Sequence, residues 1–170
     1  MNIRDLAYVI QAHNEHPRDS ASRFRKWDGK TPYSVHPIWC AATILQETSL
    51  PEELRRDGSQ ALLYHDILED TTAGLPVWIS GRVKGLVTSM TFDSSEHEWR
   101  NLWERGNEVI LFKAYDKTSN LMDGSWMTTD RRTQHAAHLQ RICDHIEPIY
   151  GPLNIIRIAR TLLQPSHPTS

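Results

Sequence analysis

The chain has 170 residues, and its 19 Lys and Arg residues nearly balance its 21 Asp and Glu residues, which gives a formal net charge of −2 with histidine neutral. This balance lacks the strongly basic face on which most binding to nucleic-acid phosphates depends, so we expect no nucleic-acid partner. No stretch approaches the roughly 20 apolar residues that span a bilayer, and the first residues contain no signal-peptide core, so we expect a cytoplasmic protein without membrane contacts.

Helical periodicity runs through almost the whole chain. Apolar residues recur three and four positions apart, and no run alternates like a strand for long enough to be assigned. Because this length is typical of one domain, we predict an all-α fold, with a single-domain helical bundle over residues 1–164 and a flexible C-terminal tail over residues 165–170. Cys40 and Cys143 fall inside helical patterns, and we predict that both lie in the core.

The predicted helices of the first half are separated by segments that contain glycine, proline or polar residues. Ser59 precedes an apolar helical pattern and has the side chain of a good N-cap, so we predict that a helix begins there. Residues 19–37 are polar and include four basic residues, which indicates a loop. Helices are therefore expected over residues 3–10, 37–45 and 59–70, with breaks at 13–17, 50–51 and 71–74.

In the second half, Pro76 can occupy the first turn of a fourth helix, and the polar residues 92–97 indicate a loop. Gly106 is expected to interrupt the following helical stretch, and Pro148 with residues 151–152 to separate the last two helices. Helices are thus predicted over residues 76–90, 99–120, 132–146 and 153–163, with Val109, Ile110, Phe112 and Leu121 as core positions.

The third predicted helix carries an unusual group of polar residues. His65 and Glu69 are four positions apart, as are Asp66 and Asp70, so the four side chains should share one surface among apolar neighbours. Carboxylates so close repel one another, and they are unfavourable in a last helical turn. A bound cation would relieve that repulsion. The alternative is that these residues only decorate a solvated helix end.

Two other segments add residues of the same chemistry. His36 stands at the start of a predicted helix, and Asp116 follows an apolar run in which a buried carboxylate needs a partner. The chain has nine histidines and two cysteines, so a metal site would use imidazole and carboxylate ligands. Two imidazoles and two carboxylates, from His36, His65, Asp66 and Asp116, suit Mn, Fe, Co or Zn and leave positions for water and substrate.

The order of these residues resembles a known family. The chain contains, in order, a histidine, a His-Asp pair, a Glu-Asp pair three residues further on, and an aspartate followed by asparagine four residues later. This order is similar to that of the HD-domain metal-dependent phosphohydrolases. More closely, the patterns RK…G.PY..HP, ALL.HD..EDT and K..DK..N resemble the hydrolase domain of RelA/SpoT-type proteins and their small stand-alone relatives. The matching segments lie between Arg25 and Leu121.

The resemblance implies an all-α fold of the HD-domain type and a metal-dependent hydrolysis. The implied reaction removes the 3′-diphosphate from (p)ppGpp and gives GDP or GTP and pyrophosphate, so the expected partner is a small nucleotide substrate. The implied cofactor is a divalent metal, typically Mn²⁺, with Fe, Co, Zn and Mg as alternatives. The implied metal ligands are His36, His65, Asp66 and Asp116, and the implied catalytic residues, which position or deprotonate the attacking water, are Glu69 and Asp70.

Substrate contacts also follow from the resemblance. Arg25 and Lys26 would contact the base or its phosphates, and Lys117 and Asn120 would lie near the phosphate and ribose. For these positions a solvated basic loop, or a lysine that merely neighbours a metal ligand, is the alternative interpretation.

Two other functions compete with this expectation. One is an HD-domain nucleotidase or nucleotide phosphatase that releases inorganic phosphate with the same metal ligands. The other, from a different class, is a non-catalytic nucleotide-binding regulatory module. The chain is too short to include an added synthetase domain, so we expect a stand-alone hydrolase, and no pattern indicates an oligomeric state.

Overall fold

A computed structural model describes residues 1–164, and the predicted C-terminal tail lies outside the described residues. Over residues 1–164 the chain forms no β-strand, only two isolated bridges, and the all-α prediction is confirmed. The elements in order are α1 (Ile3–Glu15), η1 (Ser20–Arg23), α2 (Val35–Leu45), α3 (Glu52–Tyr64), α4 (Ile67–Asp70), α5 (Gly81–Met90), α6 (Ser95–Asn101), η2 (Leu102–Glu104), α7 (Asn107–Met122), η3 (Gly124–Trp126), α8 (Thr129–Tyr150) and α9 (Asn154–Leu163).

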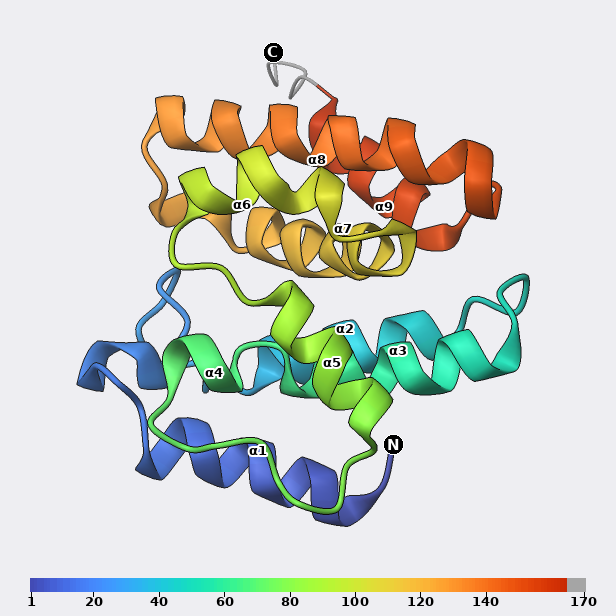
Figure 1. The fold of residues 1–170 in the computed structure, drawn as a ribbon. Helices are drawn as coiled ribbons and strands as arrows, with labels where there is room; N and C mark the ends of the chain where they lie inside the picture. The colour runs from blue at the N-terminus through green and yellow to red at the C-terminus, as the bar shows by residue number, and fades with distance from the viewer. Residues whose placement is uncertain (165–170) are drawn as a thin grey trace.

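Helix α7 is the centre of the bundle. It packs against α2 on one side and against α8 and α9 on the other, so it lies between the upper and lower helices in Figure 1. A helix in this position must be apolar over most of its circumference. The four positions predicted for this core are buried, as are both cysteines, which confirms that part of the prediction: Val109, Ile110, Phe112, Leu121, Cys40 and Cys143.

Close approach of α3 to its neighbours depends on Gly58. A Cβ atom at this position would lie 2.6 Å from the Phe112 ring and 2.7 Å from the end of Ile44. Both distances are shorter than van der Waals contact, so a side chain here would push α3 away from α2 and α7. Because α2, α3 and α7 each supply residues to the site described below, this packing sets its geometry.

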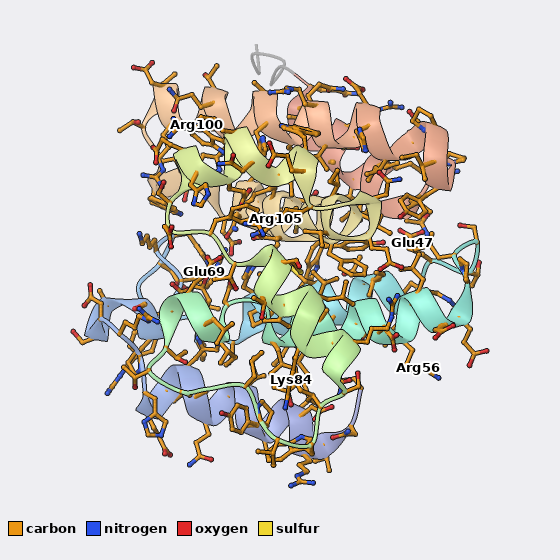
Figure 2. All side chains as sticks on the ribbon, in the orientation of Figure 1. Glu47, Arg56, Glu69, Lys84, Arg100 and Arg105 are labelled. Carbon is orange, nitrogen blue, oxygen red and sulfur yellow. The ribbon has the colours of Figure 1, made fainter. Side chains whose placement is uncertain are left out.

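A buried carboxylate ties the last helix to this core. Glu47, labelled in Figure 2, accepts hydrogen bonds from the backbone N–H groups of Asn154 (3.0 Å) and Ile155 (2.9 Å). These N–H groups belong to the first turn of α9 and have no partner inside the helix. The negative charge also lies at the positive end of the helix dipole. Glu47 therefore caps α9 from a distant part of the chain.

The predicted start of the third helix is wrong. Helix α3 begins at Glu52, after Pro51, and Ser59 is not an N-cap but lies on the buried side, where its hydroxyl donates to the Ala41 carbonyl (2.9 Å). Acidic residues at 52 and 53 favour a helix N-terminus because the macrodipole is positive there. The helix also ends sooner than predicted, at Tyr64, and resumes as the short α4.

Two further boundaries differ from the prediction. Helix α5 begins at Gly81 and not at Pro76, because Ser80 is the N-cap and its hydroxyl accepts from the Val83 N–H (3.1 Å). The predicted loop over 92–97 contains the start of α6, which Ser94 caps through the His97 N–H (3.1 Å). In both cases a serine hydroxyl satisfies a first-turn N–H.

The end of the chain also departs from the expected breaks. Pro148 lies inside α8, which continues to Tyr150 and ends at Gly151 with φ of +80°. A proline near a helix end removes one hydrogen bond only, and that loss does not stop this long packed helix. The predicted interruption at Gly106 is confirmed, since this residue has φ of +87° and precedes α7.

Within residues 1–164, no helix combines the length and the apolar character needed to cross a membrane. The limit of the predicted domain at residue 164 stays a prediction.

Candidate metal centre

Three of the four predicted metal ligands, His36, His65 and Asp116, each place one ligand atom within 4.8 Å of the others. Asp66 lies beside this group, where α2, α7 and the break between α3 and α4 meet. The Nε2 atom of His36 lies 3.4 Å from an oxygen of Asp66 and 3.4 Å from an oxygen of Asp116. The Nε2 atom of His65 lies 3.1 Å and 3.7 Å from oxygens of the same two carboxylates. All four residues are buried. Two imidazole nitrogens thus face two carboxylates in one buried cluster.

Each imidazole is held by its other nitrogen. Nδ1 of His65 lies 2.7 Å from the Leu62 carbonyl, which can only accept, so Nδ1 carries the proton and the Nε2 lone pair is directed at the cluster. Nδ1 of His36 lies 2.8 Å from the Ser119 hydroxyl. Neither Nε2 has a hydrogen-bond partner, although both are fully buried. Buried polar atoms without partners are rare, and this orientation is typical of metal-binding histidines.

The electrostatics of the cluster favour added positive charge. Burial lowers the pKa of His36. Burial also opposes the charge on His65, but Asp66 and Asp116 outweigh it and raise the pKa of His65 to about 9. A cation bound between the same groups would replace that proton, since metal ligation requires the neutral imidazole. The donor set therefore fits a divalent metal of the imidazole and carboxylate class.

His65 and Asp66 lie at a break between two helices, and both keep right-handed helical backbone dihedrals. Adjacent residues of a continuous helix project about 100° apart. Here α3 ends at Tyr64 and the next helical hydrogen bond runs from the Asp70 N–H to the Asp66 carbonyl (2.8 Å). The sequence prediction of one unbroken helix was wrong on this point. The side chains of His65 and Asp66 nonetheless both face the cluster, as the sequence predicted.

Glu69 and Asp70 lie on α4, beside the four ligands. Figure 2 shows Glu69 on α4 below the segment that joins α5 to α6, and its carboxylate accepts from the Phe92 N–H (2.9 Å). Burial raises the pKa of Glu69 to about 7 and that of Asp70 to about 6. The Asp66 charge acts in the same direction on both groups. Two carboxylates with a pKa near neutrality can accept a proton during a reaction.

Two hollows in the surface meet at Asp70. The first, of about 300 Å³, is lined by Phe24, Arg25, Lys26, Tyr33, Asn120 and Trp126 among others. The second, of about 470 Å³, is lined by Arg18, Glu69, Ser94, Ser95, Glu98 and Lys117 among others. The first hollow is the more aromatic and the second the more polar. A ligand that reaches the cluster has room on both sides of Asp70.

The residues predicted to contact substrate lie at these hollows, but most of their polar atoms bind other side chains. Arg25 is buried and donates to Asp123 (2.8 Å) and to Asn120 (3.0 Å). Asn120 donates in turn to Asp116. Lys117 contacts Asp116 through its ammonium group (3.1 Å). Lys26 differs, because its ammonium lies 4.6 Å from the ring centre of Trp126, at the rim of the first hollow.

Three residues around the cluster were missed by the sequence reasoning. Tyr33 donates its hydroxyl to Asp66 (2.9 Å). Lys113, which is fully buried, contacts Asp116 (3.0 Å) and Glu98 (3.0 Å). A lone lysine within the apolar run 109–115 was a usable signal for a buried counter-charge. Glu98 had no such signal, because its partners are distant in the sequence.

Comparison with known proteins supports the fold. No model of a known protein family matches the chain, and no curated protein sequence matches it. A solved structure described by the words "A metazoan ortholog of SpoT hydrolyzes ppGpp and plays a role in starvation responses" superposes with a TM-score of 0.70. The match covers 95% of each chain at 22% sequence identity. The chain therefore shares the fold of a SpoT-type hydrolase, which confirms the predicted fold.

Proposed function

We propose that this protein is a metal-dependent phosphohydrolase that removes the 3′-diphosphate from (p)ppGpp and releases pyrophosphate. One observation carries the proposal: two buried imidazole Nε2 atoms without partners face two buried carboxylates, in the fold of a solved metazoan SpoT ortholog that hydrolyses ppGpp. The structural match extends over almost the whole of both chains. The motifs in the sequence support the same substrate.

His36, His65, Asp66 and Asp116 would hold the metal, which we propose to be Mn²⁺ rather than Fe, Co, Zn or Mg. When bound, a divalent cation polarises a phosphoryl oxygen and lowers the pKa of a coordinated water. The protein prepares for this role in two ways. The Leu62 carbonyl sets the tautomer of His65, and Tyr33 orients Asp66 through its hydroxyl.

Asp70 and Glu69 are the proposed proton acceptors. Asp70 lies where the two hollows meet, so a water attacking a phosphorus atom at the cluster would approach it. Glu69 is fixed by the Phe92 N–H and lines the second hollow. Their raised pKa values suit general-base catalysis near neutral pH, where the group must be ionised but still basic.

The substrate would occupy both hollows. The aromatic rings of Phe24 and Trp126 suit stacking with a nucleobase, and Lys26 at the same rim suits a phosphate. Arg25, Lys117 and Asn120 remain proposed substrate contacts, through the atoms not engaged within the protein. A small nucleotide rather than a nucleic acid fits the near-neutral net charge, and we propose that the protein acts on it in the cytoplasm.

The test is a product analysis. Metal-free protein is incubated with Mn²⁺ and ppGpp, and the released product is identified as pyrophosphate or phosphate. We expect pyrophosphate and GDP in equal amounts. Release of inorganic phosphate from ppGpp or from another nucleotide in a substrate panel would instead identify a nucleotide phosphatase. Binding of ppGpp and Mn²⁺ without turnover would identify a regulatory module.

A further inference from the structure

The two oxygens of Asp116 have different surroundings. Oδ1 faces the cluster, 3.4 Å from Nε2 of His36, and also accepts from Asn120 (2.6 Å). Oδ2 points away and lies 3.0 Å from the ammonium of Lys113 and 3.1 Å from that of Lys117. Because two ammonium groups contact Oδ2, Oδ1 is the oxygen that remains available to a metal.

Both lysines are held by a second carboxylate from another helix. Glu98 on α6 is 4% exposed, and one of its oxygens lies 3.0 Å from the ammonium of Lys113 and 2.8 Å from that of Lys117. Its other oxygen lies 3.3 Å from Nε2 of His138 on α8. The series of ion pairs from Asp116 through the two lysines to Glu98 therefore joins α7 to α6 and α8.

Charge balance explains why this arrangement is stable. Burial of a single charge costs several kcal/mol, and the cost is recovered only when partners are close and well placed. Here two buried lysines face two buried carboxylates. Burial opposes the charge on Glu98, but Lys113 and Lys117 hold its pKa well below the usual range. Two ammonium groups and two carboxylates thus lie in direct contact within the buried network.

We propose that Glu98 is a positioning residue of the metal centre, which acts through Lys113 and Lys117 to occupy Oδ2 of Asp116 and to present Oδ1 as the single ligand oxygen. This inference rests on the metal centre of the proposed function. It gives a positioning role to a buried ion network, two members of which, Glu98 and Lys117, also line the second hollow. A purely structural network would stabilise the fold and leave metal binding unchanged.

The first test is Glu98→Gln in the full chain, with Mn²⁺ affinity measured by calorimetry on metal-free protein. Loss of a residue that orients a metal ligand typically weakens binding by about 10–100-fold, and we expect this range. We also expect a changed electron paramagnetic resonance spectrum of bound Mn²⁺. Glu108→Gln is the matched control. Glu108 also forms an ion pair, with Arg82 on the surface, but it lies outside the network. Its affinity should equal that of the unmodified chain.

A second variant separates positioning from simple charge. Lys113→Met removes a positive charge 3.0 Å from Asp116. If the lysines acted only through their charge, this change would strengthen Mn²⁺ binding. If they hold Oδ2, binding becomes weaker because the carboxylate can rotate, and this is the result we expect. Tighter binding by Lys113→Met would overturn the proposal.

The outcomes distinguish this inference from the function on which it rests. Failure of the unmodified chain to bind Mn²⁺ would reject the metal centre itself. Normal Mn²⁺ binding with an unchanged affinity and spectrum in Glu98→Gln would reject the inference alone. If Glu98→Gln does not fold, as judged by circular dichroism, Lys117→Met decides, because this lysine is 11% exposed and its loss is better tolerated. Unchanged Mn²⁺ affinity in Lys117→Met would then reject the positioning role.

Discussion

The histidine and aspartate cluster and the two hollows beside it differ in how their polar atoms are used. At the cluster, the Nε2 atoms of His36 and His65 have no hydrogen-bond partner, although the whole group is buried. At the hollows, Arg25 is already bound to Asp123 and Asn120. The cluster is thus prepared for a ligand that the protein does not supply. The hollows are partly built from residues that also stabilise the protein, so similar mutations in the two regions should have different effects.

Asp66→Ala is expected to have the largest effect. The change removes one of the two carboxylates that face both imidazoles, so metal retention and hydrolysis should both fall below detection. The fold should be largely kept. Metal content by mass spectrometry, turnover of ppGpp and circular dichroism check the three parts. Asp144→Ala on the exposed surface of α8 is the control. Retention of metal and turnover in Asp66→Ala would contradict the proposed centre.

Asp70→Asn should reduce turnover by about 10²–10⁴-fold, the usual contribution of a general base. A general base must be ionised, so activity should fall as the pH drops through its pKa. The pKa values of Asp70 and Glu69 are raised to about 6 and about 7, and a bound cation lowers both, so the decline should lie below about pH 7. Profiles of kcat/KM against pH for the unmodified chain and for Asp70→Asn measure this. A loss of activity on the alkaline side alone would contradict it.

Tyr33→Phe should have an intermediate effect. It removes the hydroxyl that donates to Asp66 and leaves that oxygen unpaired. Mn²⁺ affinity should fall by about 10-fold, as for other groups that orient a ligand. The free energy of unfolding of the metal-free protein should fall by only about 1 kcal/mol. Calorimetry with Mn²⁺ and denaturant unfolding provide the two measurements. An effect on unfolding without one on metal affinity would limit Tyr33 to a structural role.

Lys26→Met and Arg25→Met compare two neighbours in the hollow. Lys26 lies over Trp126, so its loss should raise KM by about 5–10-fold through one phosphate contact, with little effect on stability. Loss of the buried Arg25 should instead lower the free energy of unfolding by about 2 kcal/mol, because Asp123 loses its partner but is itself partly exposed. Steady-state kinetics and urea unfolding of both variants check the contrast. Equal effects of the two changes on stability would contradict it.

The fold class followed from the sequence because helical periodicity is a local property. Most helix positions, the buried face of α7 and the break at Gly106 were predicted correctly. Several boundaries were wrong where a local signal competed with packing. Ser59 has the side chain of an N-cap, but α3 already begins at Glu52 and buries Ser59 against α2. Pro148 breaks isolated helices, but α8 continues through it.

The sequence by itself determined which residue types the site contains: imidazoles and carboxylates rather than thiolates. Only the tertiary structure decided which atoms remain free. His36 on α2 and Asp116 on α7 meet His65 and Asp66 only in the folded chain. The lysines that contact Oδ2 of Asp116 also contact Glu98 from another helix. Hydrogen bonds and ion pairs between distant segments have no local pattern. They form only when packing brings those segments within a few ångströms.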